Sequence, residues 1–154
     1  MTGYRFQGWY DKKSGGSKIT SNTKVKKSIT YYAHWKRVLT SEEKKLVGSW
    51  SLYTSGMGYT ESFNANGTYD MILVSDTSYS KYSQFTKGFW RVSGGTVYMT
   101  NLQYQTSEDG GNTFSPWIQQ STPNKTMKIK HGSDENGQYF IDLKYDVKVY
   151  KTKI

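Results

Sequence analysis

From Gly48 onward the sequence alternates between apolar and polar residues with a period of two, in short stretches separated by Gly, Asn and Ser clusters. The stretches that this pattern predicts as strands are residues 46–53, 59–64, 68–75, 87–93, 96–102, 116–120, 125–130 and 138–151. No segment between them is long enough for a helix that connects parallel strands. The pattern therefore predicts an all-β fold, an antiparallel barrel or sandwich in which hairpins join about eight strands as a meander.

Composition supports strands and excludes several classes of protein. Tyr, Phe and Trp supply 14, 6 and 5 residues, against only 2 Pro, a balance that favours β-structure. No apolar run approaches the roughly 20 residues that cross a bilayer, and the first residues lack the apolar core of a signal peptide. The absence of Cys excludes disulfides, thiolate metal sites and a cysteine nucleophile.

Positive charge is concentrated at the start of the chain. The net charge is +9, yet residues 1–40 hold nine Lys and Arg against the single acid Asp11, while the remainder is nearly balanced. The basic segment is thus a separate module with a solvated face, and we expect no nucleic-acid partner. Unspecific attraction to an anionic cell-wall polymer is the one partner that this charge suggests.

Two turns set the register of their hairpins. If Gly67 is left-handed in a three-residue loop, Phe63 pairs with Tyr69 and Glu61 lies opposite Met71.

A second turn at residues 94–95 pairs Val92 with Val97 and Trp90 with Met99. The last stretch has no turn residue, so we predict one long curved strand with Tyr139 on the inner face, although a hairpin near Lys144 is an alternative.

The segments GYRFQGWYDKKSGG and TKVKKSITYYAHW resemble the C-terminal half of the internalin-type B repeat, the Listeria-Bacteroides repeat family, over residues 1–36. Members are tandem modules of bacterial surface proteins. The resemblance implies an extracellular or cell-surface location and a two-stranded hairpin at residues 1–38. Because the front half of the repeat does not precede Gly3, we expect this hairpin not to close a core alone. Thr40 and Glu43 have the spacing of a capping box, which predicts a helical turn at the boundary.

The second domain, residues 39–154, carries three motifs in order: LVGSW at 46–50, FNANGTY at 63–69 and GFWRVSGGTV at 88–97. In this order they resemble bacterial lipocalin-like domains of the calycin group, over residues 46–151. The resemblance implies an eight-stranded up-and-down barrel in which Gly48 and Trp50 close one end. The family often packs an Arg of the last strand on that Trp. Here the basic residues available are Lys148, Lys151 and Lys153, so either a Lys stem closes the barrel or the barrel stays partly open.

Aromatic residues supply the candidate binding surfaces. The residues assigned to the inner face, as core or as the wall of a cavity for a small apolar or sugar-like ligand, are Tyr59, Glu61, Phe63, Tyr69, Trp90, Met99 and Tyr139. A ligand would place Glu61 near an open mouth that water reaches. The outward aromatics Phe89, Tyr82, Phe85 and Trp117 are an alternative, a flat patch for a polysaccharide or a partner protein.

Few residues in the sequence could support catalysis. His34 and His131 lie in different modules, so neither a His-based metal site nor a Ser/His/Asp triad can be assembled. Asp70 and Asp142 are expected to face outward, which leaves Glu61 as the one inward carboxylate where glycoside hydrolysis needs two.

The loop at 106–113 offers Glu108, Asp109 and Asn112 as oxygen ligands, but an ordinary turn is expected there. We therefore predict no catalytic residue, no metal and no cofactor.

These observations favour a non-catalytic module of a bacterial surface protein that binds a small ligand or acts as a spacer. The alternatives are a carbohydrate-binding β-sandwich and a small hydrolase. An enclosed cavity indicates the first, an exposed aromatic row the second, and two convergent carboxylates the third.

Overall fold

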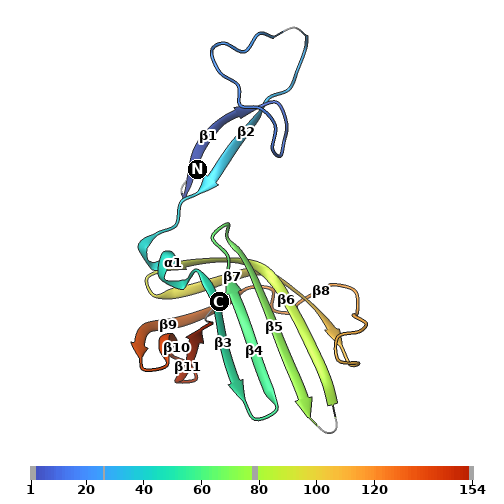
Figure 1. Cartoon of the computed structure of the whole chain (residues 1–154), viewed down its shortest axis with the longest axis vertical. Helices are drawn as coiled ribbons and strands as arrows, with labels where there is room; N and C mark the ends of the chain where they lie inside the picture. The colour runs from blue at the N-terminus through green and yellow to red at the C-terminus, as the bar shows by residue number, and fades with distance from the viewer. Residues whose placement is uncertain (1–2, 26, 78–79, 153–154) are drawn as a thin grey trace. The chain divides into compact units, whose positions relative to one another are not determined.

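The computed structural model describes residues 3–25, 27–77 and 80–152. The chain forms two compact units, Met1–Leu39 and Thr40–Ile154, and each has its own β-sheet (Figure 1). The division falls next to the boundary predicted from charge and motifs. Lys26 of the basic N-terminal segment and Lys153, a candidate for the contact with Trp50, lie outside the described residues.

The N-terminal unit is the predicted two-stranded hairpin. Strands β1 (Tyr4–Tyr10) and β2 (Tyr32–Arg37) pair antiparallel, with an irregularity between Phe6 and Gly8. The Phe6 ring lies 5.9 Å from that of Trp9 and 5.1 Å from that of Trp35. All three side chains stay exposed, because two strands alone offer little apolar surface to bury them.

The second unit begins with the short helix α1 (Ser41–Leu46), which has the predicted capping box. The backbone N–H of Glu43 donates to Thr40 Oγ1 over 3.1 Å, and the N–H of Thr40 donates to Glu43 Oε2 over 2.9 Å. Glu42 Oε1 accepts a hydrogen bond from the Gly95 N–H over 3.2 Å. The helix is therefore tied to a turn of the barrel.

The rest of this unit is a closed antiparallel barrel of eight strands, as predicted. Its strands are β3 (Gly48–Thr54), β4 (Met57–Phe63), β5 (Thr68–Thr77), β6 (Ser80–Ser93), β7 (Thr96–Ser107), β9 (Lys125–Asp134), β10 (Gly137–Asp142) and β11 (Val147–Lys151). Each pairs with the next in this order, and β11 pairs with β3 to close the ring. This is an up-and-down connection.

Residues 116–120 do not supply a barrel strand, which corrects one expectation. Only β8 (Ile118–Gln119) forms, and it pairs with the second half of β7 at Gln103 and Tyr104. The first half of β7, from Thr96 to Met99, pairs with β9 instead. Strand β8 therefore lies beside the ring.

Both predicted hairpin registers are confirmed. Phe63 pairs with Tyr69, and Trp90 pairs with Met99. The turn glycines have the left-handed backbone that these loops require, with φ of 93° at Gly67.

The last stretch is a hairpin, not one long strand. Residues 143–146 turn the chain between β10 and β11, and Asp146 takes a left-handed φ of 53° although it is not glycine. Asp142 supports this turn, because its Oδ1 accepts the Lys144 N–H over 2.9 Å and its carbonyl accepts the Asp146 N–H over 2.8 Å. The predicted face of β10 is consequently wrong. Phe140 is fully buried, whereas the ring of Tyr139 lies on the outer face, 5.8 Å from that of Tyr150.

The barrel core is largely aromatic and aliphatic. Its buried apolar residues are Leu46, Trp50, Phe63, Tyr69, Trp90, Val92, Val97, Met99, Leu102, Ile129, Phe140 and Val149.

Candidate functional site

The inner face of the barrel brings the predicted aromatic residues into contact with one another. The Phe63 ring lies 5.3 Å from the rings of both Tyr69 and Trp90, and 6.5 Å from that of Phe140. All four side chains are at most 4% exposed. These rings occupy the space between them and pack as a core. Met99 is also buried, beside Trp90 in the hairpin.

Glu61 is buried rather than placed at a mouth that water reaches. It is 5% exposed, and its Oε2 accepts a hydrogen bond from the Tyr69 hydroxyl over 3.0 Å. Burial raises the pKa of Glu61 to about 7 despite this hydrogen bond. Burial and the charge of Glu61 also raise the pKa values of Tyr59, which is partly buried, and of Tyr69.

Asp142 shares the inner face with Glu61, which corrects the expectation that it points outward. It pairs with the buried Ile129 across β9 and β10, and its negative charge raises the pKa of Glu61 further. The inner face of the described barrel strands therefore carries two carboxylates. A single continuous strand would have placed Tyr139 and Ile141 inward, but the turn at residues 143–146 allows Phe140 and Asp142 to face inward instead.

Trp50, which the resemblance predicts to close one end of the barrel, is part of the buried core. Its side chain is 1% exposed, and its indole N–H donates to the Leu46 carbonyl over 2.7 Å. The Lys151 Nζ lies 5.5 Å from the centre of the indole. Lys151 thus occupies the place where the lipocalin-like resemblance implies an Arg, while Lys148 forms an ion pair with Asp134 over 2.7 Å. Gly48 has a φ of 131°, and a Cβ there would lie 3.0 Å from Lys151 Cε.

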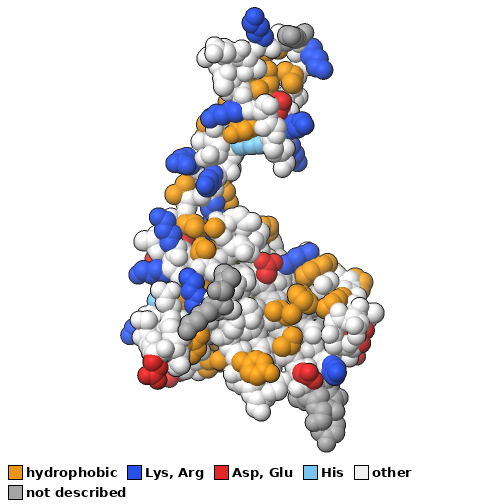
Figure 2. Space-filling view, viewed as in Figure 1, with side chains coloured by type: hydrophobic (Ala, Val, Ile, Leu, Met, Phe, Trp, Pro, Cys, Tyr) orange, Lys and Arg blue, Asp and Glu red, His pale blue; other side chains and the backbone are white. Residues whose placement is uncertain are grey.

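The outer face of β4 to β7 carries two adjoining hollows of about 250 Å³ and about 500 Å³, which share Asp70 and Lys87. We refer to them together as the outer groove. Its lining residues are Thr60, Ser62, Thr68, Tyr69, Asp70, Met71, Ile72, Phe85, Thr86, Lys87, Gly88, Phe89, Asn101, Gln103, Trp117 and Gln119. Figure 2 shows hydrophobic side chains gathered on one side of the barrel unit, over β6 and the segment that carries β8.

Three of the four aromatics predicted to face outward belong to this groove. Phe89 and Trp117 are 53% and 41% exposed, and Lys87 Nζ lies 3.7 Å from the centre of the Trp117 ring. The Phe85 ring meets that of Phe114 edge to face at 5.1 Å.

The fourth, Tyr82, lies on the inner face. Its hydroxyl donates to Gln84 Oε1 over 3.0 Å, and the amide of Gln84 donates to the buried Thr86. Strand β6 begins at Ser80, earlier than predicted, so its alternation places Tyr82 on the same face as Trp90.

Polar side chains of the groove are held in place. Asn64 Nδ2 donates to Asp70 Oδ2 over 2.6 Å, and Gln119 Nε2 donates to the Leu102 carbonyl over 2.8 Å. Their positions are therefore fixed by contacts within the chain, while Asp70 and Lys87 supply one charge of each sign.

The segment that carries Trp117 is organised by Asp109. Its carboxylate accepts hydrogen bonds from the Ser107 and Thr113 hydroxyls, both over 2.6 Å, and from the Asn112 N–H over 2.9 Å. These bonds lower the pKa of Asp109. The loop uses these oxygens for its own turn, and no cluster of three His, Asp or Glu that could hold a metal occurs in the described residues. A sequence signal existed, since Asp followed by hydroxyl residues is typical of such turns.

In comparisons with known proteins, the N-terminal unit is similar to one repeat family. The family model described as the Listeria-Bacteroides repeat domain matches residues 1–34, and this match indicates a module of a bacterial surface protein. No curated protein and no solved structure matches the chain significantly. Among the described residues, no helix has the length and apolar character that spanning a membrane requires.

Proposed function

We propose that the chain is a non-catalytic, extracellular module in which a lipocalin-like barrel binds a polysaccharide along its outer groove. The observation that carries this proposal is the combination of exposed aromatic rings with fixed polar side chains on one face of the barrel. Phe89 and Trp117 are the exposed rings, and Asp70, Gln103 and Gln119 are polar groups that line the same groove.

A sugar chain fits this combination chemically. The C–H faces of a sugar ring pack against aromatic side chains, and its hydroxyls need hydrogen-bond donors and acceptors near by. Lys87 already contacts Trp117, and Asn64 already holds Asp70, so little side-chain freedom is lost on binding. Because Asp70 and Lys87 balance each other, the groove favours a neutral polysaccharide over an anionic one.

The packing of the barrel interior supports the outer surface as the binding site. The rings of Phe63, Tyr69 and Trp90 contact one another where a ligand in an enclosed cavity would have to lie. Exposed aromatic patches on small proteins often serve as recognition surfaces, whereas an interior filled with its own side chains has no room for a ligand.

The test is retardation of the whole chain in gels that contain a neutral polysaccharide, with xylan, β-glucan and soluble chitin compared. We expect retardation in at least one gel, and at least a tenfold weaker affinity for Trp117→Ala and for Phe89→Ala. Tyr53→Ala is the matched control, because Tyr53 is 77% exposed and lies outside the groove. Retardation by none of the polysaccharides, or equal affinities for Trp117→Ala and the control, would contradict the proposal.

A glycoside hydrolase is the second candidate, because the inner face carries Glu61 and Asp142 together. A carboxyl with a pKa of about 7 suits a general acid, and a second carboxylate is the other requirement of this chemistry. The assay is release of nitrophenol from nitrophenyl glycosides. Activity that Glu61→Gln abolishes and the exposed-loop variant Glu108→Gln retains would favour this candidate, and absence of turnover in the wild type would reject it.

A further inference from the structure

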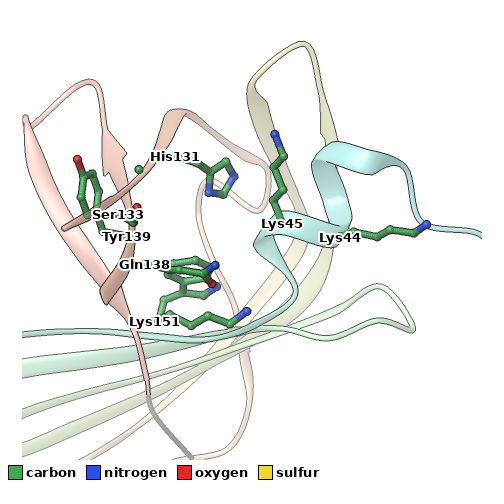
Figure 3. Close-up of a pocket in the computed structure, with 9 residues that line it drawn as sticks. Lys44, Lys45, His131, Ser133, Gln138, Tyr139 and Lys151 are labelled. Carbon is green, nitrogen blue, oxygen red and sulfur yellow. The ribbon is translucent and has the colours of Figure 1, made fainter. Parts of the chain in front are cut away.

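A separate hollow of about 420 Å³ lies beside Trp50, at the end of the barrel that the resemblance predicts to be closed, and we refer to it as the closed-end pocket. It is built from five elements of the second unit, one of which is β3 with Trp50. Helix α1 supplies Lys45, β9 supplies His131 and Ser133, β10 supplies Gln138, and β11 supplies Lys151. In Figure 3, His131 and Lys151 lie around the hollow, the Lys45 side chain runs beside His131 with its ammonium turned away from Lys151, and the side chain of Lys44 points away from the hollow.

The lining of this pocket carries positive charge only. Its charged lining residues are lysines, and none of them is Asp or Glu. No carboxylate in the described ranges forms an ion pair with Lys45 or Lys151, although Lys148 on the same strand pairs with Asp134. Two lysines that line a partly enclosed space, with no carboxylate among the lining residues, favour an anionic occupant, because the lower effective dielectric there strengthens the attraction.

Neutral groups complete the pocket. Burial, chiefly, and the charge of Lys45 lower the pKa of His131, while Glu42 of α1 acts in the opposite direction. The imidazole is therefore mainly neutral at pH 7 and offers one N–H donor. The indole N–H of Trp50 is already used by the Leu46 carbonyl, so the indole offers only its ring surface. The Gln138 amide and the Ser133 hydroxyl supply further donors.

We infer that the closed-end pocket binds a phosphate-bearing ligand, with the phosphate at Lys151, toward which the long side chain of Lys45 can turn, and the rest of the ligand against Trp50. Point-like ammonium donors that approach from α1 and β11 suit a tetrahedral anion with several oxygens. A planar carboxylate is instead matched by the fork of an Arg, and no Arg lines this pocket. The phosphate belongs either to a free phosphate monoester or to a phosphodiester unit of a wall polymer. This inference is independent of the outer groove.

The experiment is an NMR titration of the whole chain at constant ionic strength, which follows the Trp50 indole N–H and the ring protons of His131. The probes are inorganic phosphate, glycerol 3-phosphate, a short glycerol-phosphate oligomer, and glycerol as the uncharged control. We expect saturable shifts with the phosphate probes and none with glycerol. Bound phosphate should also raise the pKa of His131, which Lys45, Lys151 and Glu42 surround, because an anion favours the imidazolium.

Variants decide whether the pocket itself binds. Lys151→Met keeps an apolar stem over Trp50 and should weaken phosphate binding about tenfold, and Lys45→Met should weaken it severalfold. Lys128→Met, an exposed lysine on β9, is the matched control and should change nothing. Shifts that do not saturate, equal losses in Lys151→Met and Lys128→Met, or equal affinity for acetate would overturn the inference.

The two phosphate sources are distinguished by the oligomer. Tighter binding of the oligomer than of glycerol 3-phosphate identifies a wall polymer, and the reverse order identifies a free monoester. Trp117→Ala should weaken polysaccharide binding and leave phosphate binding unchanged. The outer-groove proposal and this inference can therefore fail independently in the two assays.

Discussion

Replacing Glu61 by Gln should change how the stability of the barrel depends on pH. In the folded chain Glu61 holds its proton up to about pH 7, whereas an ordinary glutamate releases it near pH 4.5. Between these two values the folded state therefore binds more protons than the unfolded state. The free energy of unfolding must then fall as the pH rises through this window, and it should level off above pH 7.

The size of the effect follows from the two pKa values. A change from 4.5 to about 7 corresponds to about 3 kcal/mol, at about 1.4 kcal/mol for each tenfold change in proton concentration. Gln keeps an oxygen that can accept the Tyr69 hydroxyl but has no charge to bury. We expect Glu61→Gln to gain about 3 kcal/mol relative to the wild type as the pH rises from 4.5 to 8.

The assay is urea unfolding followed by tryptophan fluorescence at intervals between pH 4.5 and 9. The informative quantity is the difference between wild type and variant at each pH, since titrating groups that do not interact with Glu61, such as His131 with its lowered pKa, contribute equally to both. Glu108→Gln, in an exposed loop, is the control and should show a flat difference. A flat difference for Glu61→Gln as well would refute the claim that this carboxyl is buried.

Three further outcomes test other parts of the structure. Trp50→Ala should lower the free energy of unfolding by about 3 to 5 kcal/mol in the same urea assay, because it removes a fully buried ring and its hydrogen bond; stability equal to the wild type would remove Trp50 from the core. Deleting residues 1–38 should leave one cooperative thermal transition while removing salt-sensitive retention on an anionic polymer column, since the barrel is a separate unit; a non-cooperative melt would show that the units share a core. Asp109→Ala should weaken polysaccharide retardation severalfold with under about 1 kcal/mol lost in global stability, because the loop that carries Trp117 loses its hydrogen bonds; unchanged retardation would separate this loop from binding.

The registers of two hairpins could be predicted from the sequence because their turns contain glycine. Gly67 and the pair at residues 94–95 mark where the backbone must be left-handed, and the side-chain alternation then follows. The turn between β10 and β11 has no such marker, since Asp146 adopts the same backbone region at a cost. The alternation of one continuous strand therefore predicts Tyr139, and not Phe140, on the inner face. It also predicts that Asp142 faces outward, away from Glu61.

The candidate sites were less predictable than the barrel because they depend on contacts between distant segments. The spacing of Gly48 and Trp50, with the resemblance it supports, indicated the closed end and a lysine near it. Nothing in the local sequence places Lys45 of α1 near His131 of β9. Similarly, the sequence predicted that aromatic residues such as Trp117 face outward. It could not predict the contact between Trp117 and Lys87, because this contact depends on a loop whose path is set by Asp109.

Strand β8 has a further consequence, which concerns association between copies of the chain. Because only the first half of β7 pairs with β9, the second half of this long strand has an edge outside the ring, and the two residues of β8, Ile118 and Gln119, cover part of that edge. Both prolines of the sequence, Pro116 and Pro123, flank these two residues and cannot donate a backbone hydrogen bond to an incoming strand. A surface protein carries its modules at high local concentration, and β8 with its flanking prolines makes this edge of β7 a poorer template for edge-to-edge aggregation.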